Sequence, residues 1–342
     1  MDISRKKNSQ VTILDVARES GVSYSTVSRV LNGFDFVKGS TREKVLEAAE
    51  RLGYVANIQA RSLAGGRTQI IGLLVPGLDN GYITEIVGGI DQELAHSDYD
   101  LMLYTTHRFQ GKESLYVKTI ANGLVDGLIL LVPHNAQNYL QALPNQNFPY
   151  VLVDQIDNTY NSTTVDATNW QGAYDAASYL IKLGHQRIGF IMGHPELNSA
   201  RERFDGYRAA LQHHRIAYEE SLVIEGDYLT KSGYSGAKHL LSLPQPPTAI
   251  FASNDLSAFG VLDAIHEAGL RIPEDISVVG FDDIPLASLV YPKLTTVRQP
   301  LVQIGQVAVR LLLEKLENPE KEARRVTLAT ELVVRDSSAP RG

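Results

Sequence analysis

Polar side chains that suit the binding of a hydroxylated small molecule follow several short apolar runs of the sequence. Asn254, Asp282 and Asp157 each stand at or shortly after the end of such a run, and Arg203 lies on the helix expected after another. Carboxylates and amides exchange hydrogen bonds with vicinal hydroxyls, and an arginine can clamp such groups with two parallel donors. The pattern therefore indicates a cleft that binds a sugar or a related molecule.

Aromatic residues near these positions could stack on the apolar face of a sugar ring. The candidates are Tyr228, Tyr82 and Trp170, although Tyr228 also fits a role in packing alone. Asp255 fits a helix cap better than a ligand contact, and Asp283 is open to the same interpretation. Arg203, Asn254 and Asp282 therefore remain the main candidates for ligand binding.

No motif of enzyme chemistry accompanies these residues. The sequence holds no Gly-x-x-x-x-Gly-Lys run, no Gly-x-Gly-x-x-Gly after a strand and no Gly-x-Ser-x-Gly elbow. The rings of His213 and His214 diverge on one expected helix, which favours a solvated surface over a metal site. The absence of cysteine excludes a thiolate nucleophile and fits a reducing cytoplasm. We expect no catalytic activity, no metal and no cofactor.

The elements that position these residues begin at Gln69, where apolar runs start to alternate with amphipathic helices. This alternation indicates α/β architecture, with parallel, doubly wound sheets and helices on both faces. About ten such units exceed one sheet, so we expect two lobes, with ligands beyond the carboxyl ends of the strands. Strands are expected at 70–75, 101–105, 127–132, 150–153, 187–192, 249–253 and 276–280, and helices at 82–96, 171–183, 200–213, 233–243 and 255–268.

The N-terminal segment has a different pattern, of two short helices joined by a tight turn. Thr12 can cap the first helix, Gly21 ends it, and Ser23 can cap the second. Helices this short are not stable alone, so a third, expected at 41–52, must pack on them. The inward face of the third helix is expected to hold Val45, Leu46, Ala49 and Leu52.

The exposed face of the second helix suggests contact with DNA. A recognition helix presents polar side chains to the major groove near its N-terminus. Residues 1–69 hold 11 Lys and Arg against 7 Asp and Glu, whereas the rest of the chain holds 21 against 32. A basic head concentrates phosphate attraction at one end, despite the net charge of -7. The polar residues of this face are Tyr24, Ser25, Ser28, Arg29 and Asn32.

This segment resembles the headpiece of the LacI/GalR-type repressors. The resemblance rests on the ordered run 11–32, followed by Thr41-Arg-Glu-Lys-Val45 and Leu52-Gly-Tyr54. It implies a three-helix, helix-turn-helix DNA-binding headpiece in which Tyr24, Ser25 and Arg29 contact bases in the major groove. The remaining headpiece positions that it assigns to DNA binding are Thr12, Thr26, Ser28, Asn32, Thr41 and Tyr54.

The segment Asn57 to Ala64 resembles the hinge helix of the same family. Seven or eight residues cannot hold a helix in water unaided, so we expect it to fold only with a partner subunit and DNA. The resemblance implies that Leu63 wedges into the minor groove, and it also assigns Asn57, a reasonable cap of this helix, and Ala60 to DNA binding. Ala56 stands where the family usually has proline.

The resemblance continues along the body, in Leu183-Gly-His-Gln-Arg-Ile-Gly189, Ser253-Asn-Asp255, 276–283 and 294–300. It implies a periplasmic-binding-protein-like body of two lobes, joined by three crossovers around an effector cleft. Effector-contacting positions then comprise Arg203, Asn254 and Asp282, with Asp157, Tyr228 and Tyr82 as further matches. The expected division is 1–56 for the DNA-binding domain, 57–68 for the hinge helix and linker, and 69–342 for the body, with an N-lobe of 69–167 and 298–327 and a C-lobe of 168–297 and 328–340.

These features together predict a ligand-responsive repressor that binds a pseudo-palindromic operator as a homodimer. An effector in the cleft is expected to change the rotation of the N-lobes and thereby the pairing of the hinge helices. A sugar or glycoside is the expected effector, with a purine as the alternative, since the cleft lacks an obvious pair of phenylalanines. Whether the effector is an inducer or a corepressor stays open.

Two other classes of protein share parts of this pattern. A secreted or periplasmic sugar-binding component of a transporter would share the body, but the polar N-terminus is not a signal peptide. A nucleotide-dependent enzyme of the doubly wound class is a more distant alternative. We expect a cytoplasmic protein at the nucleoid, without a membrane span. Because 336–342 has no apolar heptad pattern, we expect a dimer and not a tetramer.

Overall fold

The structure is a computed structural model of the 342-residue chain. It describes residues 11–31, 36–54, 67–106, 113–133, 140–141, 143, 148–155 and 162–341, except for the side chains of 113–116. Contacts divide the chain into two compact units, Met1–Thr68 and Gln69–Gly342. Five of the predicted site residues lie outside the described residues, namely Asn32, Asn57, Ala60, Leu63 and Asp157, as does the expected hinge helix at 57–64.

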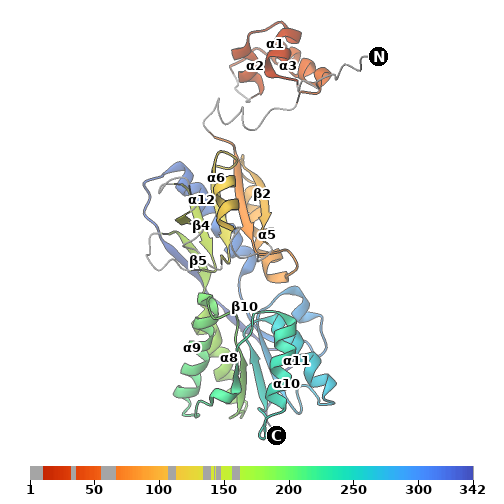
Figure 1. Cartoon of the computed structure of the whole chain (residues 1–342), viewed down its shortest axis with the longest axis vertical. Coiled ribbons are helices and arrows are strands. Elements are labelled where there is room, and N and C mark those ends of the chain that lie inside the picture. The colour runs from red at the N-terminus through yellow and green to blue at the C-terminus, as the bar shows by residue number, and fades with distance from the viewer. Residues whose placement is uncertain are drawn as a thin grey trace, which may run out of the picture. The chain divides into compact units, whose positions relative to one another are not determined.

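The headpiece contains three helices, α1 (Ile13–Ser20), α2 (Tyr24–Leu31) and α3 (Gly39–Leu52) (Figure 1). The Asp15 carboxylate accepts hydrogen bonds from the backbone N–H of Thr12 at 2.9 Å and from its hydroxyl at 2.7 Å. Gly21 ends α1 in the left-handed conformation that favours glycine, with a φ of 70°. The small core that holds the three helices together consists of Val16, Val27, Val30, Val45, Ala48 and Ala49.

One prediction for the third helix was wrong. Leu46 is 49% exposed, and Ala48 occupies the inward face instead. Leu46 directly follows the buried Val45, and successive residues of an α-helix point about 100° apart. The helix therefore turns Leu46 toward solvent when Val45 faces the core.

The body contains two six-stranded sheets, each in its own lobe. The N-lobe sheet has the order β11-β5-β4-β3-β1-β2, and all of its pairs are parallel. The C-lobe sheet has the order β12-β10-β9-β8-β6-β7, in which only the edge strand β12 is antiparallel. The strands are β1 (Ile70–Val75), β2 (Asp100–Thr105), β3 (Gly127–Leu131), β4 (Tyr150–Val153), β5 (Thr164–Ala167), β6 (Ile188–Ile191), β7 (Val223–Ile224), β8 (Ala249–Ala252), β9 (Ser277–Asp282), β10 (Thr295–Arg298), β11 (Arg325–Leu328) and β12 (Glu331–Val333).

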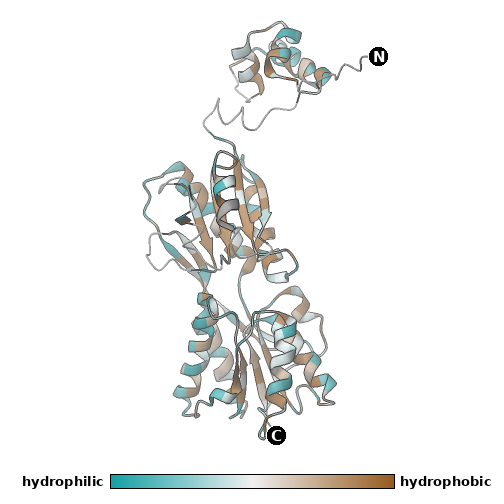
Figure 2. Cartoon of the chain, in the orientation of Figure 1, coloured by the Kyte–Doolittle hydropathy of each residue, from teal (hydrophilic) through white to brown (hydrophobic). Residues whose placement is uncertain are grey.

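Helices cover both faces of each sheet, as the strand-helix alternation predicts. In the C-lobe, α8 and α9 pack together on one side and α10 and α11 on the other (Figure 1). The central strands are apolar along their whole length, which Figure 2 shows as brown arrows inside each lobe. The body helices are α5 (Gly81–Leu94), α6 (Glu113–Ala121), α8 (Asn169–Lys182), α9 (Asn198–His213), α10 (Thr230–Leu241), α11 (Asp255–Glu267) and α12 (Leu301–Glu317), with short 3-10 turns at Glu220–Leu222 and Pro285–Ser288.

Three crossovers join the lobes, and they confirm the predicted two-lobed fold. The chain passes from β5 to α8, from β10 to α12, and from β11 to β12. The first and third crossovers lie side by side, because the hydroxyls of Thr168 and Thr330 are 2.9 Å apart. None of the helices within the described residues is long and apolar enough to cross a membrane.

Candidate functional site

A pocket lies between the two lobes, at the carboxyl ends of strands from both sheets. It encloses about 600 Å³, part of which is open to solvent. In open parallel sheets this edge is where ligands bind. The described residues that line it from the N-lobe are Pro76, Asn80, Tyr82, Ile83, Val132 and Asp154. Those that line it from the C-lobe are His194, Leu197, Arg203, Asp227, Tyr228, Asn254 and Asp282.

Arg203 is the only arginine or lysine among these lining residues, and it is 2% exposed. Its Nε donates to Asn169 Oδ1 at 2.9 Å and its Nη1 donates to the Ser253 carbonyl at 2.6 Å. The guanidinium lies over the Phe281 ring, 3.8 Å from the centroid. These contacts fix the guanidinium, while its Nη2 has no hydrogen-bond partner among the described residues.

Asp282 ends β9 and is 3% exposed. Its Oδ1 accepts a hydrogen bond from Gln299 Nε2 at 2.7 Å and lies 3.5 Å from Arg203 Nη1. Burial raises the pKa of the Asp282 carboxyl to about 7, and the neighbouring Arg203 and Gln299 offset this only in part. The carboxylate is thus held in place by one oxygen and leaves the other available to a ligand.

Left-handed backbone conformations recur around this pocket. Val132, Asp154, Tyr228 and Asp282 have φ values of 48°, 55°, 67° and 116°. Residues other than glycine adopt such values at a cost of about 1–3 kcal/mol, and they concentrate at functional sites. All four residues line the pocket, so the strained backbone positions coincide with the candidate site.

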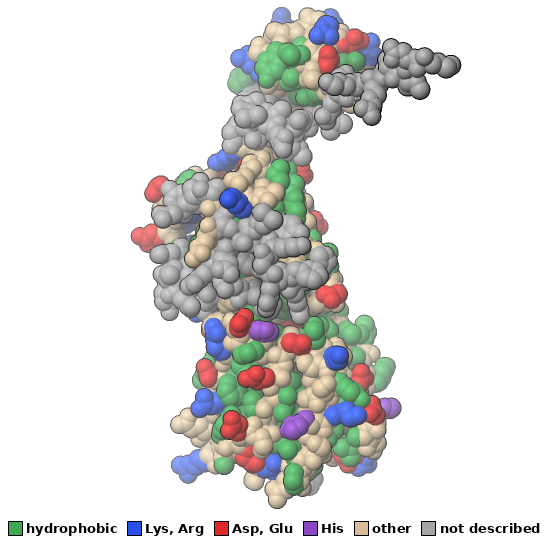
Figure 3. All heavy atoms as spheres, in the orientation of Figure 1, with side chains coloured by type: hydrophobic (Ala, Val, Ile, Leu, Met, Phe, Trp, Pro, Cys, Tyr) green, Lys and Arg blue, Asp and Glu red, His purple; other side chains and the backbone are tan. Residues whose placement is uncertain are grey.

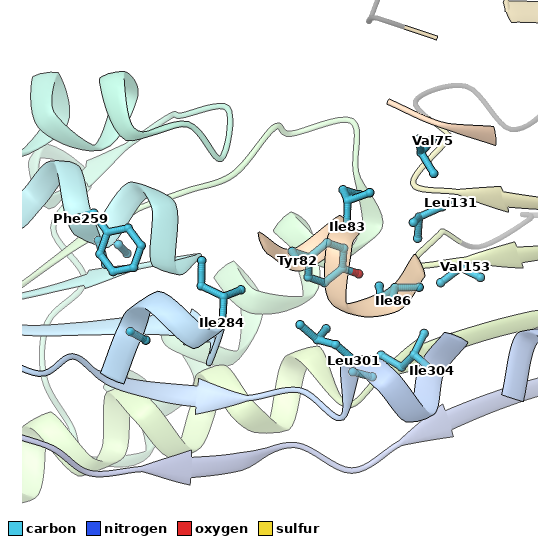
Figure 4. Packing of buried hydrophobic residues seen from close by; sticks show 14 of the residues in the cluster. Val75, Tyr82, Ile83, Ile86, Leu131, Val153, Phe259, Ile284, Leu301 and Ile304 are labelled. Carbon is cyan, nitrogen blue, oxygen red and sulfur yellow. The ribbon is translucent and has the colours of Figure 1, made fainter. Parts of the chain in front are cut away.

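Asp154 and Tyr82 bring polar groups into the pocket beside the apolar packing of the N-lobe. The Asp154 carboxylate accepts one hydrogen bond from a described residue, Ser199 Oγ at 3.4 Å, and burial raises its pKa to about 6. The Tyr82 side chain lies among Ile83, Ile86 and other apolar residues (Figure 4), and its buried hydroxyl has no hydrogen-bond partner among the described residues. Burial raises the Tyr82 pKa well above its usual value, and the nearby Asp154 contributes. An unsatisfied buried hydroxyl beside a cavity suggests a ligand partner.

Tyr228 and Asn254 form the opposite wall of the pocket. The Tyr228 ring covers Gly193 so closely that a Cβ there would lie 2.0 Å from the ring, so glycine is required at this position. Burial raises the Tyr228 pKa to about 12. The Asn254 amide donates to the Tyr228 carbonyl at 3.0 Å and its Oδ1 accepts from Ser257 N–H at 3.0 Å. Asn254 therefore both lines the pocket and caps α11.

Two expectations about individual residues were wrong. Asp255 does not cap α11, because Asn254 does; its carboxylate instead accepts from the Thr296 hydroxyl at 2.6 Å and from Ile284 N–H at 2.9 Å. Trp170 is 42% exposed and stacks on Tyr174, outside the residues that line the pocket. The adjacent Asn169 is buried and accepts from Arg203, whereas the Trp170 side chain is exposed on another side of the same helix.

Four polar residues of the pocket were not predicted from the sequence, namely Asn80, Asp154, His194 and Asp227. Asp154 directly follows β4, so the strand-end rule could have found it before Asp157, three residues further on. His194 follows β6 at a greater distance and Asp227 precedes Tyr228, so neither position carries a comparable signal.

The pocket is connected to the crossovers through two adjacent aspartates. Asp282 accepts from Gln299, which lies on the crossover between β10 and α12. Asp283 accepts from Arg298 Nε at 2.7 Å on the same crossover, and its other oxygen pairs with Arg335 Nη2 at 2.6 Å just beyond β12. A ligand that binds Asp282 therefore acts on a residue bonded directly to the chain that joins the lobes.

Comparison with known proteins decides the family. Residues 12–57 match the model of the bacterial regulatory proteins of the lacI family, and residues 177–338 match the periplasmic binding protein-like domain. The chain is 37% identical over 330 residues to catabolite control protein A of Priestia megaterium, covering 96% of this chain and 99% of the relative. The chain belongs to the LacI family.

Solved structures of family members share the same architecture. A lac repressor dimer bound to operator and the anti-inducer ONPF is 31% identical with a TM-score of 0.84, covering 97% of this chain and 100% of that chain. A complex of the transcriptional regulator CelR with cellobiose is 33% identical with a TM-score of 0.75, covering 96% and 99%. The chain is thus a LacI-family DNA-binding transcriptional repressor with a periplasmic-binding-protein-like body, and its relatives are transcriptional regulators.

The headpiece presents the polar side chains expected of a LacI-family recognition helix. Tyr24, Ser25 and Arg29 of α2 are exposed, and Arg29 has no ion-pair partner among the described residues. Ser25 is oriented by a 2.9 Å hydrogen bond between its hydroxyl and that of Ser23, which also contacts Thr26. Figure 3 shows Lys and Arg side chains at the headpiece surface. Of the other predicted DNA contacts, Thr12 is exposed and Thr26, Ser28, Thr41 and Tyr54 are half-buried.

Proposed function

We propose that this repressor binds a pseudo-palindromic operator as a homodimer and that a sugar or glycoside in the interlobe pocket changes its affinity for that operator. The observation that carries the proposal is the connected set Arg203, Asp282 and Gln299, in which the pocket's carboxylate is bonded to a crossover. Coupling between two sites requires an element that both ligands bias. The crossover from β10 to α12 is that element.

The chemistry of the pocket favours a sugar. Asp282, Asp154 and Tyr82 offer hydrogen-bonding atoms that have no partner among the described residues, and a sugar hydroxyl can both donate and accept. The Tyr228 ring adds a flat apolar surface. Solved relatives with bound cellobiose or ribose support the same class. A purine is less suited, because no phenylalanine lines the pocket within the described residues.

Self-association is supported by exposed apolar side chains in the segment that follows Asp282. Leu286, Leu289 and Tyr291 are 46%, 67% and 90% exposed, and they follow Asp282 by only a few residues. Large apolar side chains clustered at a surface commonly mark an interface between proteins. The lac repressor relative is itself a dimer on its operator.

A ligand screen tests the sugar assignment. Thermal denaturation of the full chain is recorded with mono- and disaccharides and with purines, for the wild type and for Asp282→Ala. We expect at least one sugar to raise the melting temperature of the wild type and to lose that effect in the variant. Stabilisation by a purine alone would reject the sugar assignment, and a sugar that stabilises Asp282→Ala equally would reject the role of Asp282.

A further inference from the structure

The interlobe pocket holds more acidic than basic side chains. Asp154, Asp227 and Asp282 line it, against one arginine, Arg203. The other titratable side chains among the described lining residues are those of His194, Tyr82 and Tyr228. Asp255, on the adjoining α11, is fully buried, and burial together with the neighbouring Asp282 raises its pKa well above the usual value, which favours its uncharged form. Above about pH 7, where Asp154 and Asp282 are both ionised, the carboxylates that line the pocket outnumber its one arginine.

Arg203 offsets the negative charge of these carboxylates only in part. Its Nε and Nη1 are used by Asn169 and the Ser253 carbonyl, and its contact with Asp282 is a single 3.5 Å approach. A bidentate arginine-carboxylate pair would hold two shorter bonds. Burial raises the pKa of Asp154 to about 6 and that of Asp282 to about 7 in spite of the positive charge beside them, so both carboxyls are ionised at pH 8.

The polar atoms that lack partners favour a ligand that donates hydrogen bonds. Among the described residues, Asp282 Oδ2 accepts no hydrogen bond. The Tyr82 hydroxyl, on a side chain that is 7% exposed, lies near the Asp154 carboxyl but makes no hydrogen bond of good geometry with a described residue. Ionised carboxylates only accept, so a ligand must supply donors to satisfy them. Arg203 Nη2 is the one charged donor left for an acceptor atom of the ligand.

A negatively charged ligand would be repelled by the carboxylates of this pocket. Its carboxylate or phosphate would lie near two buried carboxylates in a site of low dielectric, where like charges repel several times more strongly than in water. A single arginine that is already shared with Asp282 cannot compensate for both groups. A neutral hydroxylated ligand avoids this cost and satisfies the free acceptors.

We propose that the pocket selects a sugar without an anionic group and excludes uronic acids and sugar phosphates. This inference rests on the proposed function, because it takes the interlobe pocket as the effector site. In this proposal the carboxylates of Asp154 and Asp282, on either side of Arg203, repel an anionic ligand and so favour a neutral one.

The test compares neutral sugars with their charged analogues by isothermal titration calorimetry on the full chain at pH 8. The matched sets are glucose, glucosamine, glucuronate and glucose 6-phosphate; galactose and galacturonate; ribose and ribose 5-phosphate; and cellobiose with its oxidised acid, cellobionate. We expect a neutral member of one set to bind at least about tenfold more tightly than its anionic counterparts. An anionic member that binds as tightly as its neutral analogue would overturn the proposal while leaving a ligand-responsive repressor intact. Absence of binding by every sugar would instead reject the sugar effector itself.

Variants assign the selectivity to the pocket. Asp154→Asn removes one negative charge from the pocket, and Asp205→Asn removes one from the exposed surface of α9, where Asp205 is 61% exposed. We expect Asp154→Asn to narrow the ratio of neutral to anionic affinity by about tenfold, whereas Asp205→Asn leaves it unchanged. If Asp154→Asn does not fold, the half-buried Asp227→Asn provides the same comparison. A folded variant with an unchanged ratio of neutral to anionic affinity would contradict the proposed role of the pocket carboxylates.

Discussion

At the scale of single residues, Arg29 and Asp282 belong to different units of the chain and to different candidate sites. Arg29 is exposed on α2 of the headpiece, while Asp282 is 3% exposed in the body. The first has no ion-pair partner among the described residues, and the second is bonded to Gln299 and close to Arg203. A substitution of either residue therefore tests one of the two sites at a time.

Arg29→Ala should weaken binding to the operator by about 1–3 kcal/mol and relax base preference, because an arginine in the major groove commonly makes a bidentate contact with a base. The measurement is a fluorescence-anisotropy titration with the operator and with duplexes mutated at each base pair. Arg18→Ala is the matched control, since Arg18 is exposed on α1 and pairs with Asp15. Unchanged discrimination among the duplexes would contradict the assignment.

Asp282→Asn should change how stability depends on pH. The pKa of this carboxyl is about 7 in the folded chain against 3.8 ordinarily, so between these values the folded chain binds more protons than the unfolded chain. The contribution of Asp282 to the free energy of unfolding therefore falls as pH rises through this window. The amide does not titrate, so the stability of the variant relative to the wild type should increase by roughly 1–3 kcal/mol from pH 5 to pH 8.

Urea denaturation of the full chain at both pH values measures this difference. His185, whose pKa is lowered by burial, opposes the trend in both proteins, so it cancels in the comparison. A relative stability that is constant or falls with pH would show that the buried carboxylate is not the titrating group.

At the scale of elements, close helix packing depends on particular glycines. The backbones of α5 and α12 approach so closely that a Cβ at Gly89 would lie 2.1 Å from the Val302 carbonyl oxygen. Gly88, its neighbour on α5, faces open space. The pair therefore separates the effect of a glycine on helix propensity from its effect on packing.

Gly89→Ala should lower the free energy of unfolding of the body by roughly 1–3 kcal/mol, because the helices must move apart. Gly88→Ala should be neutral or stabilise by up to about 1 kcal/mol, since alanine favours the helix. Urea denaturation of both variants checks this prediction. Equal effects of the two substitutions would mean that α5 and α12 do not pack as described.

The elements were largely predictable from the sequence, and so were the main site residues. Apolar runs such as 127–132 predict buried strands, and polar residues at strand ends locate Asn254 and Asp282. The pocket's N-lobe wall was less predictable, because the burial of Tyr82 results from packing between distant segments. For Trp170 the residue type suits stacking on a sugar, but its side chain is exposed and does not line the pocket.

At the scale of the whole molecule, the exposed apolar residues after Asp282 are expected to join two copies of the chain. Leu289→Asp should weaken self-association by at least about tenfold, because it places a charge in an apolar contact. Tyr218→Asp, at a side chain 44% exposed near the end of α9, is the control. Sedimentation equilibrium measures both, and an unchanged dimer in Leu289→Asp would rule out this surface.

Function at this scale depends on communication between the pocket and the operator. Arg203 and Asp282 belong to the C-lobe, and the crossover from β10 to α12 carries Gln299 toward the N-lobe. A ligand can change operator affinity only by its different affinity for two arrangements of the protein. Gln299 is the residue through which the pocket is expected to affect those arrangements.

The most direct test of this account is an operator titration of the wild type in the absence and presence of a saturating neutral sugar identified by the screen, repeated with Asp282→Ala. We predict that the sugar changes the operator Kd of the wild type by about 5- to 150-fold and leaves that of Asp282→Ala unchanged. A wild-type operator Kd that is the same with and without the bound sugar would contradict the account.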